Sequence, residues 1–344
     1  MRLAVDVMGG DNAPDAIIKG CVEALDSLAQ DDKLLLIGDR STIADILAEL
    51  GTTDPRLVIE HAGACISMDD SPAKAVRAKP DSSIVQAALR GSKKHEDPVD
   101  CVLSAGNTGA CVAASIMHMK RLPGVHRPGI AVTIPAFKGP VVLCDAGANP
   151  QPTHIHLWQY GVMADIYARV VLGIKSPRVA LMNIGSEEAK GSDLVRKTRD
   201  LLRKTPDLNF IGYVEGRDLF DGVADVIITD GFVGNTLLKM AEGMARSIFT
   251  AIAHEVIDAD PALAMQLEPI FRGIYAKNDY HEYGGAPLLG VNGSFFISHG
   301  SSQARTIRAA IRTCREYVLN HVNDALASRI NAIEYLTHTE RELA

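Results

Sequence analysis

The sequence predicts an α/β fold with a mostly parallel sheet that is covered by helices on both faces. Short apolar runs alternate along the chain with longer stretches whose apolar residues recur every three or four positions, a pattern typical of βαβ units. The apolar runs hold few polar residues, as expected for parallel strands buried on both faces. A chain of 344 residues has room for one large α/β domain or two modest ones.

Strands and helices alternate through the first third of the chain. Pro14 suits the first turn of the helix that follows it, where its missing N–H breaks no hydrogen bond. Ser41 is the expected N-cap of the next helix. We predict strands at 3–8, 33–37, 57–60 and 100–103, and helices at 15–28, 41–50, 83–90 and 111–119.

The same alternation continues to the end of the chain. A helix that begins after Ser302 would carry Arg305 and Arg308 in its first turns, and the tail from about residue 331 holds no motif and is expected to be peripheral. The further strands are predicted at 130–135, 141–144, 178–182, 209–213 and 226–229, and the further helices at 152–172, 193–204, from 236 onward and at 302–330.

Composition and charge exclude several classes of protein. Hydrophobic residues make up 47% of the chain and charged residues 22%, which is ordinary for a globular domain. The net charge of −7 argues against general nucleic-acid binding. The N-terminus enters a strand directly, and no uncharged apolar run approaches the roughly 20 residues that cross a bilayer. The six cysteines form no Cys-x-x-Cys pair, so we expect buried thiols in a cytoplasmic protein.

Five predicted strands end in a polar turn that contains glycine and precedes a helix. Such a turn presents backbone N–H groups to an anion, and in an open parallel sheet ligands bind beyond the carboxyl ends of the strands. We therefore expect the five turns to share one cleft. Their candidate binding residues are Gly9, Gly10 and Asp11; Ser104, Gly106, Asn107, Thr108 and Gly109; Asp145 and Asn149; Asn183, Gly185 and Lys190; and Asp230, Gly234 and Asn235.

A basic run and a histidine are further candidates. Lys74, Arg77 and Lys79 stand close together; such a run is usually a solvated face, and contact with an anion is the alternative. His299 follows a glycine-rich stretch that includes Gly285 and precedes a helix. It is either a structural histidine or a general base or phosphate contact.

Several common catalytic motifs are missing from the sequence. It contains no strict Gly-x-Gly-x-x-Gly, no P-loop, no His-Glu-x-x-His and no Gly-x-Ser-x-Gly. These absences disfavour the usual dinucleotide fingerprint, P-loop phosphoryl transfer, zinc hydrolysis and serine hydrolysis. The pair His154 and His156 would point to different faces of a helix, so we expect packing or surface roles there and no metal site.

Residues 240–275 are expected to form two helices joined near residues 258–261, as a hairpin that projects from the main body. Their apolar residues exceed what a solvated arm requires. Dimer packing is the favoured reason, and contact with a membrane surface or another partner is the alternative.

Taken together, residues 5–14, 104–110, 145–149, 230–235, 285–290 and 299–301 resemble the motifs of the bacterial phosphate acyltransferase (PlsX) family, collinearly from residue 1 to about 330. The resemblance implies a single three-layer α/β/α domain, similar to phosphate acetyltransferase and the isocitrate/isopropylmalate dehydrogenases. It also implies a homodimer that uses neither a metal nor an organic cofactor and is soluble or loosely associated with the inner face of the cell membrane.

The implied reaction moves a long acyl chain from acyl carrier protein to inorganic phosphate, giving acyl phosphate for phospholipid synthesis. Phosphate would be its own nucleophile, so the site must bind a dianion and stabilise an oxyanion. Asn107 with the backbone of 106–109 suits the oxyanion or phosphate. Lys190 and some of Lys74, Arg77 and Lys79 are candidates to neutralise phosphate, and His299 is a candidate to protonate the leaving thiolate or to orient phosphate.

Two further expectations concern the acidic residues and the carrier protein. For Asp6, Asp11, Asp145 and Asp230, hydrogen bonds that orient the turns are favoured over catalysis. Carrier proteins are acidic, so docking requires a local basic patch, for which 74–79 and 121–127 are candidates. The rival functions are a short-chain acyl-CoA phosphate acyltransferase of the same fold and a non-catalytic scaffold for carrier protein and membrane.

Overall fold

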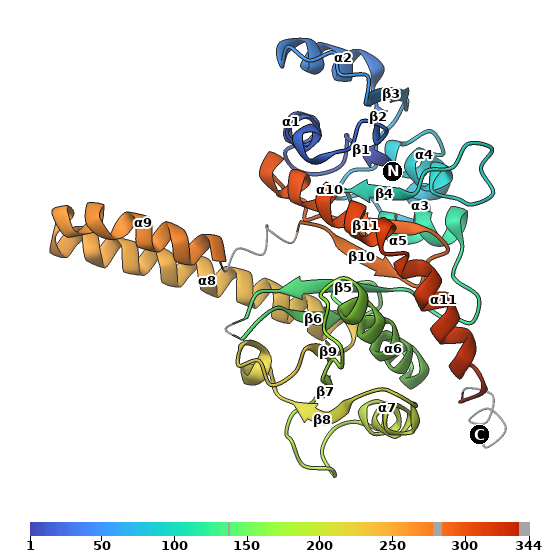
Figure 1. Cartoon of the computed structure of the whole chain (residues 1–344), viewed down its shortest axis with the longest axis vertical. Helices are drawn as coiled ribbons and strands as arrows, with labels where there is room; N and C mark the ends of the chain where they lie inside the picture. Colours follow the sequence, from blue (N-terminus) through green and yellow to red (C-terminus); the bar gives the residue numbers. More distant parts are fainter. Residues whose placement is uncertain (137, 278–283, 337–344) are drawn as a thin grey trace.

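The computed structural model describes residues 1–136, 138–277 and 284–336, and its centre is one sheet of eleven strands in the order β3-β2-β1-β4-β11-β10-β5-β6-β9-β7-β8 (Figure 1). The strands are β1 (Arg2–Asp6), β2 (Lys33–Gly38), β3 (Leu57–His61), β4 (Cys101–Ser104), β5 (Gly129–Ile134), β6 (Val141–Cys144), β7 (Val179–Met182), β8 (Phe210–Val214), β9 (Val226–Ile228), β10 (Ala286–Leu289) and β11 (Ser294–Ile297).

The sheet consists of two parallel blocks joined by antiparallel strands. In the first block β3, β2, β1, β4 and β11 run parallel, and in the second β6, β9, β7 and β8 do so. Between them, β10 is antiparallel to β11 and β5, and β5 is antiparallel to β6. The predicted α/β class with a mostly parallel sheet is confirmed. The β10–β11 hairpin lies in the glycine-rich stretch for which the sequence analysis predicted no strand.

Helices follow most of the strands, with a few boundaries that differ from expectation. Asp39, and not Ser41, caps α2 by accepting the Thr42 N–H. The single helix expected at 302–330 is two helices, since the chain turns at His321, whose φ is 51°. The helices are α1 (Asp15–Ala24), α2 (Arg40–Glu49), α3 (Pro72–Ala78), α4 (Ser83–Arg90), α5 (Thr108–Ala114), α6 (His154–Val170), α7 (Asp193–Lys204), α8 (Gly231–Ala259), α9 (Pro261–Lys277), α10 (Ala304–Leu319) and α11 (Val322–Ile333), with short helical turns at Leu25–Ser27, Ser115–Met119 and Gly216–Phe220.

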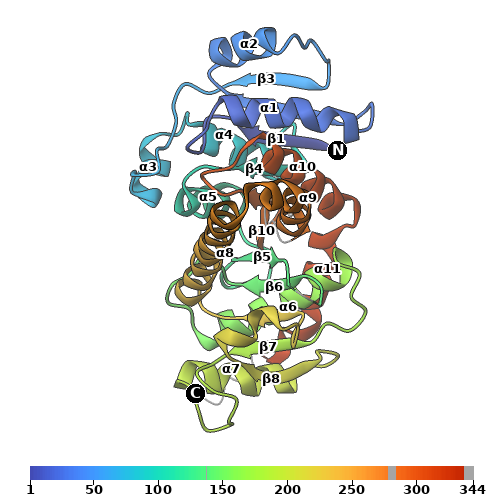
Figure 2. The same cartoon turned by 90° about the vertical axis from the view of Figure 1, so that its left-hand side faces the viewer.

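Alternate residues of each strand point to opposite faces, and this builds two helical layers over the sheet (Figure 2). Leu3 and Val5 of β1 join the core formed with α1, α10, α6 and α11. Ala4 between them faces the other core, which contains α4 and α5. On that same side the second block packs against the first turns of α8 through residues such as Val233 and Leu237. The structure is therefore a three-layer α/β/α sandwich.

The helices α8 and α9 form a long hairpin that leaves the body of the molecule (Figure 1). Along α8 the exposed apolar residues Met240, Met244, Ile248 and Ile252 are spaced by four, so they form one stripe along the helix. Within the part of the chain that the structure describes, no helix is both long enough and apolar enough to cross a membrane. Residues 337–344 of the predicted peripheral tail lie outside the described residues.

Candidate functional site

A cavity of about 400 Å³ opens between the two parallel blocks. The first block contributes Asp11 after β1, Thr108 at the start of α5 and His299 after β11, and the second contributes Gly147 after β6 and Asn235 on α8. Its remaining described lining residues are Met68, Ile130, Val132, Thr133, Ala146, Leu238, Lys239, Glu242, Gly284, Gly285, Ala286, Ile297, Ser298, Gly300 and Thr306.

Four of the five predicted glycine turns line this cavity, and the fifth does not. In the fifth turn the Asn183 amide donates to the carbonyls of Gly185 (3.0 Å) and Lys190 (3.3 Å), so it closes the turn on itself. The Lys190 ammonium pairs with Glu187 at 2.8 Å. Because β9 lies between β6 and β7 in the sheet, this turn is one strand farther from the centre, and Asn183, Gly185 and Lys190 are not among the described lining residues.

The first two turns are joined through a buried carboxylate. Ser104 donates to Asp6 at 2.7 Å and its hydroxyl accepts the Gly106 N–H at 3.1 Å. A Cβ at Gly9 would lie 2.8 Å from the Gly106 nitrogen, so the two turns touch backbone to backbone. Burial raises the pKa of Asp6, which lies wholly inside the protein. Asp6 therefore orients these turns and does not reach the cavity.

Gly10 and Asp11 connect the same region to the loop that carries His299. Gly10 has a φ of +114°, a conformation that favours glycine, and it directs the Asp11 N–H onto the Gly300 carbonyl at 2.7 Å. The Asp11 side chain lines the cavity.

Asn107 is the N-cap of α5, and its side chain is engaged at both ends. Its Oδ1 accepts the Ala110 N–H at 3.1 Å, while its Nδ2 lies 3.1–3.2 Å from the carbonyl oxygens of Ser67, Met68 and Asp70. The side chain is buried, with 7% of its residue surface exposed. Asn107 thus fixes the 67–70 loop, which delivers Met68 to the cavity, and this geometry favours a positioning role over direct contact with an oxyanion.

The neighbouring glycine has a structural reason for its identity. A Cβ at Gly109 would lie 2.6 Å from the ring of Pro72, so Gly109 permits α3 to pack against α5. In the same turn, Thr108 lines the cavity.

Asp145 orients the turn after β6 in the same way. Its carboxylate accepts four backbone N–H groups at 2.7–3.1 Å, from residues 130, 147, 148 and 149. The Asn149 amide donates to the Tyr160 hydroxyl and the Pro128 carbonyl, both at 2.7 Å. Both side chains therefore build the turn and leave Gly147 to face the cavity.

The start of α8 is capped by the protein itself. Asp230 accepts the N–H groups of Phe232 and Val233 at 3.0 and 2.9 Å, and the Gly231 N–H donates to the Asn149 carbonyl at 2.9 Å. These N–H groups are used within the turn, so the start of α8 does not offer them to an anion in the cavity. As predicted for the strand-end acids, Asp6, Asp145 and Asp230 make hydrogen bonds that shape the turns.

Among the described lining residues, the cations are Lys239 and, when protonated, His299. The two side chains contact each other through Nζ and Nε2. Glu242 lies one helical turn after Lys239, with its carboxylate 3.7 Å from Lys239 Nζ and 3.9 Å from His299 Nε2. The sequence analysis missed Lys239 and Glu242 because both stand in an ordinary helix. One feature of the sequence could have located them. Lys239 and Glu242 are three positions apart, and therefore on one helical face, in the helix that begins at the Asp230–Asn235 turn.

The predicted basic run lies beside the cavity and not in it. Lys79 pairs with Asp70 at 2.6 Å, and Lys74 and Arg77 are exposed on α3, which packs against α5. The other basic stretch, 121–127, lies at the opposite end of β10, where Leu122 bonds to the Gly290 carbonyl. Of the two candidate docking patches, the one on α3 is therefore nearer to the cavity.

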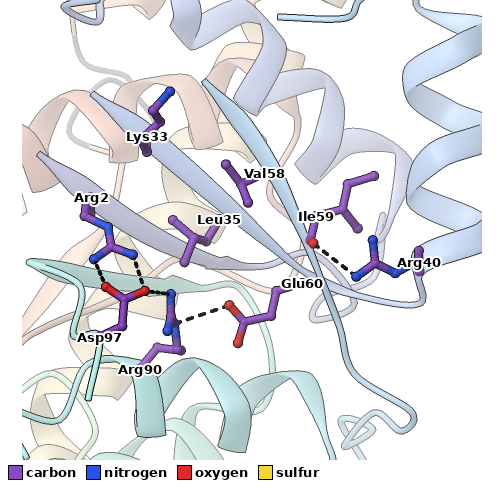
Figure 3. A pocket seen from close by; sticks show the side chains of 9 residues that line it. All are labelled: Arg2, Lys33, Leu35, Arg40, Val58, Ile59, Glu60, Arg90 and Asp97. Atoms are coloured by element: carbon purple, nitrogen blue, oxygen red, sulfur yellow. Dashed lines mark hydrogen bonds and ion pairs between the residues drawn. The ribbon is translucent and has the colours of Figure 1, made fainter. Parts of the chain in front are cut away.

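A second cavity, over β1, β2 and β3, is built around ion pairs (Figure 3). Asp97 accepts from Arg2 and Arg90, and Arg90 also lies 3.2 Å from Glu60. Each of these arginines faces a carboxylate, so the network ties strands β1 and β3 to α4 and the loop after it. Among the described residues, no three His, Cys, Asp or Glu side chains are grouped to hold a metal ion.

Comparisons with known proteins agree with this architecture. Residues 1–325 match the model of a family described as "Fatty acid synthesis protein". The chain is 46% identical over 333 residues to a phosphate acyltransferase of Heliobacterium modesticaldum, covering 96% of this chain and 98% of that protein. It is 43% identical, with the same coverage, to a phosphate acyltransferase of Bacillus licheniformis.

Solved structures with a similar fold share little sequence with the chain. A phosphotransacetylase from Streptococcus pyogenes aligns with a TM-score of 0.62 at 16% identity, covering 97% of this chain and 94% of that one. A branched-chain phosphotransacylase from Enterococcus faecalis aligns with a TM-score of 0.55 at 14% identity, covering 92% and 99%. At such identities the likeness shows the fold alone.

Proposed function

The chain belongs to the fatty acid synthesis protein family, with phosphate acyltransferases among its relatives, and from this premise we propose that it transfers a long-chain fatty acyl group from acyl carrier protein to inorganic phosphate. The product is an acyl phosphate for phospholipid synthesis. The reaction requires a cleft that holds a small dianion beside an apolar acyl thioester.

The composition of the central cavity is the observation that carries this proposal. Its described lining combines Lys239, His299 and Thr108 with an apolar wall of side chains from both blocks and from β5 between them. A cation paired with hydrogen-bond donors suits phosphate, and an apolar wall suits an acyl chain. The apolar side chains of this wall are Met68, Ile130, Val132, Leu238 and Ile297.

The proposed chemistry needs no nucleophile from the protein. An oxygen of hydrogen phosphate attacks the thioester carbon, the C–S bond breaks, and the proton of the phosphate ends on the departing thiolate. His299 stands at the cavity and is the group that we propose to orient the phosphate for this transfer. The protein's main contribution is to hold the two substrates in line and to stabilise the oxyanion.

We propose separate surfaces for the carrier protein and for a second subunit. The chain carries a net charge of −7, so an acidic carrier protein needs a local basic surface. Lys74 and Arg77, exposed on α3, offer one next to α5. We further propose a cytoplasmic homodimer that packs through the exposed apolar stripe of α8, with contact at the inner membrane face as the alternative use of that stripe.

The donor is tested by comparing thioesters. The purified protein is incubated with phosphate and either palmitoyl-carrier protein or acetyl-CoA, and free thiol is measured. We expect phosphate-dependent thiol release with the carrier-protein substrate. Turnover with acetyl-CoA alone would identify a short-chain enzyme, and tight carrier-protein binding without release would identify a scaffold.

A further inference from the structure

We propose that Lys239 and His299 form the phosphate-binding site of the cavity and that Glu242 positions Lys239. This inference rests on the proposed phosphate transfer and adds residues that no motif in the sequence marked. It starts from the contact between Lys239 Nζ and His299 Nε2, two groups 60 positions apart in the chain.

The hydrogen bonds of the His299 ring indicate which of its two nitrogens carries the proton. His299 Nδ1 lies 3.2 Å from the Ser301 backbone nitrogen and 2.7 Å from the Ser301 hydroxyl. A backbone N–H only donates, so we assign Nδ1 as the acceptor. The neutral ring then carries its proton on Nε2, so Nε2 and Lys239 Nζ are both donors and their contact is not a hydrogen bond between them.

Two adjacent donors repel each other unless an acceptor lies between them, and an anionic oxygen that enters between Lys239 Nζ and His299 Nε2 is such an acceptor. An ammonium offers three N–H donors and a full charge, and Nε2–H adds a directed hydrogen bond. An oxygen of a tetrahedral phosphate accepts from both at once. The same chemistry occurs in inorganic phosphate and in the phosphodiester of a carrier-protein or CoA arm, so the experiment must separate these two sources.

Glu242 has its carboxylate close to both side chains but makes a hydrogen bond to neither. Its carboxylate is 3.7 Å from Lys239 Nζ and 3.9 Å from His299 Nε2, beyond a normal hydrogen bond. Its side chain is 9% exposed, whereas that of Lys239 is 50% exposed. A buried carboxylate at this distance attracts the ammonium group and holds the lysine side chain against the cavity. Glu242 is thus a positioning residue that acts through Lys239.

The arrangement also explains why the site lies between the two blocks. His299 follows β11 of the first block, and Lys239 belongs to α8, which follows β9 of the second. Each block supplies one donor, so bound phosphate would bridge them.

Steady-state kinetics of Lys239→Gln test the site. We expect the KM for inorganic phosphate to rise about 10-fold or more, the KM for palmitoyl-carrier protein to stay within about twofold, and Lys239→Arg to recover most of the loss. Lys197→Gln, an exposed lysine on α7, is the matched control and should behave as wild type. A change confined to the donor KM would assign Lys239 to the phosphodiester, and no change in either would remove it from the site.

Phosphate binding without a donor separates this inference from the proposed function. Phosphorus NMR or calorimetry with inorganic phosphate alone should detect binding to the wild type and its loss in Lys239→Gln, even if no acyl donor is turned over. Normal turnover with an unchanged phosphate KM in the variant would refute the inference and leave the function standing. If Glu242 acts through Lys239, Glu242→Gln raises the phosphate KM alone but adds nothing to Lys239→Gln; additive effects would refute the positioning role.

Discussion

The backbone at Gly234 approaches the Asp145 carbonyl oxygen so closely that a Cβ at position 234 would lie 2.0 Å from that oxygen. This contact packs the first turn of α8 onto the turn after β6. It sets where Asn235, Leu238 and Lys239 enter the cavity, because all three follow Gly234 on the same helix. The position of the lysine therefore depends on the absence of a side chain one turn earlier.

Gly234→Ala is expected to displace the start of α8 and to lower both stability and turnover. Forcing a methyl group against fixed backbone costs about 1–3 kcal/mol, measured as a change in the free energy of unfolding in urea. Gly243→Ala is the matched control, since a Cβ there meets nothing within 4 Å. In that helix interior alanine should stabilise by up to about 1 kcal/mol. Equal effects of the two substitutions would contradict the close contact.

Asn107→Ala should reduce stability and turnover together. The variant loses the N-cap of α5, worth about 1 kcal/mol, and leaves the carbonyls of the 67–70 loop without their donor. Turnover should fall about 100-fold, because Met68 and the start of α5 both line the cavity. The measurement pairs urea unfolding with steady-state kinetics. A loss of turnover with an unchanged unfolding midpoint would instead support direct oxyanion contact by Asn107.

Stability should fall as the pH drops from about 6.5 toward about 4, in part because of His156. Burial, with the nearby charges of His126 and Arg127, lowers the pKa of His156 to about 4, whereas an unfolded histidine titrates near about 6.5. The unfolded chain thus binds the proton first, and acid destabilises the fold through this window. The neutral Nδ1 accepts the Thr153 N–H at 3.0 Å at the start of α6.

His156→Gln checks this pH dependence. Glutamine at this position keeps an acceptor for the N-cap N–H and does not titrate. The loss of unfolding free energy between about pH 7 and about pH 5 should therefore be smaller in the variant than in wild type. An identical loss in both proteins would exclude His156 as a source.

The apolar stripe of α8 predicts a dimer in solution. Met244→Asp places a charge in the stripe and should convert the dimer to a monomer by sedimentation, with the helical content unchanged. Thr250→Asp adds the same charge on the same helix but outside the i, i+4 series of the stripe, and should remain dimeric. A wild-type monomer would contradict the homodimer and leave membrane or partner contact as the use of the stripe.

Much of the fold could be predicted because strand burial and helix periodicity are local properties. The alternation of apolar runs and amphipathic stretches located nine of the eleven strands within a few residues. The two it missed, β10 and β11, form a short antiparallel hairpin within a stretch rich in glycine. The two parallel blocks run in opposite directions because of the way β10 and β5 pair between them in the folded sheet. A local sequence pattern does not contain that information.

The candidate site could be predicted in part, for a similar reason. Strand-end turns are visible in sequence, and four of the five do line the cavity. The order of strands is not visible, so the turn of Asn183, Gly185 and Lys190 was expected in the cleft, although β9 separates β7 from β6. Lys239 was overlooked because its role comes from meeting His299, a contact across 60 residues.

The central claim is that one cleft holds phosphate against an acyl thioester, so that a phosphate oxygen forms the new bond to carbon. The most direct measurement incubates the protein with palmitoyl-carrier protein and phosphate labelled with oxygen-18 at every position, then determines the mass of the acyl phosphate and the free carrier thiol. We predict a product that keeps every labelled oxygen, with one thiol released for each acyl phosphate formed. Thiol release that does not require phosphate, or acyl phosphate that has lost a labelled oxygen, would contradict the account.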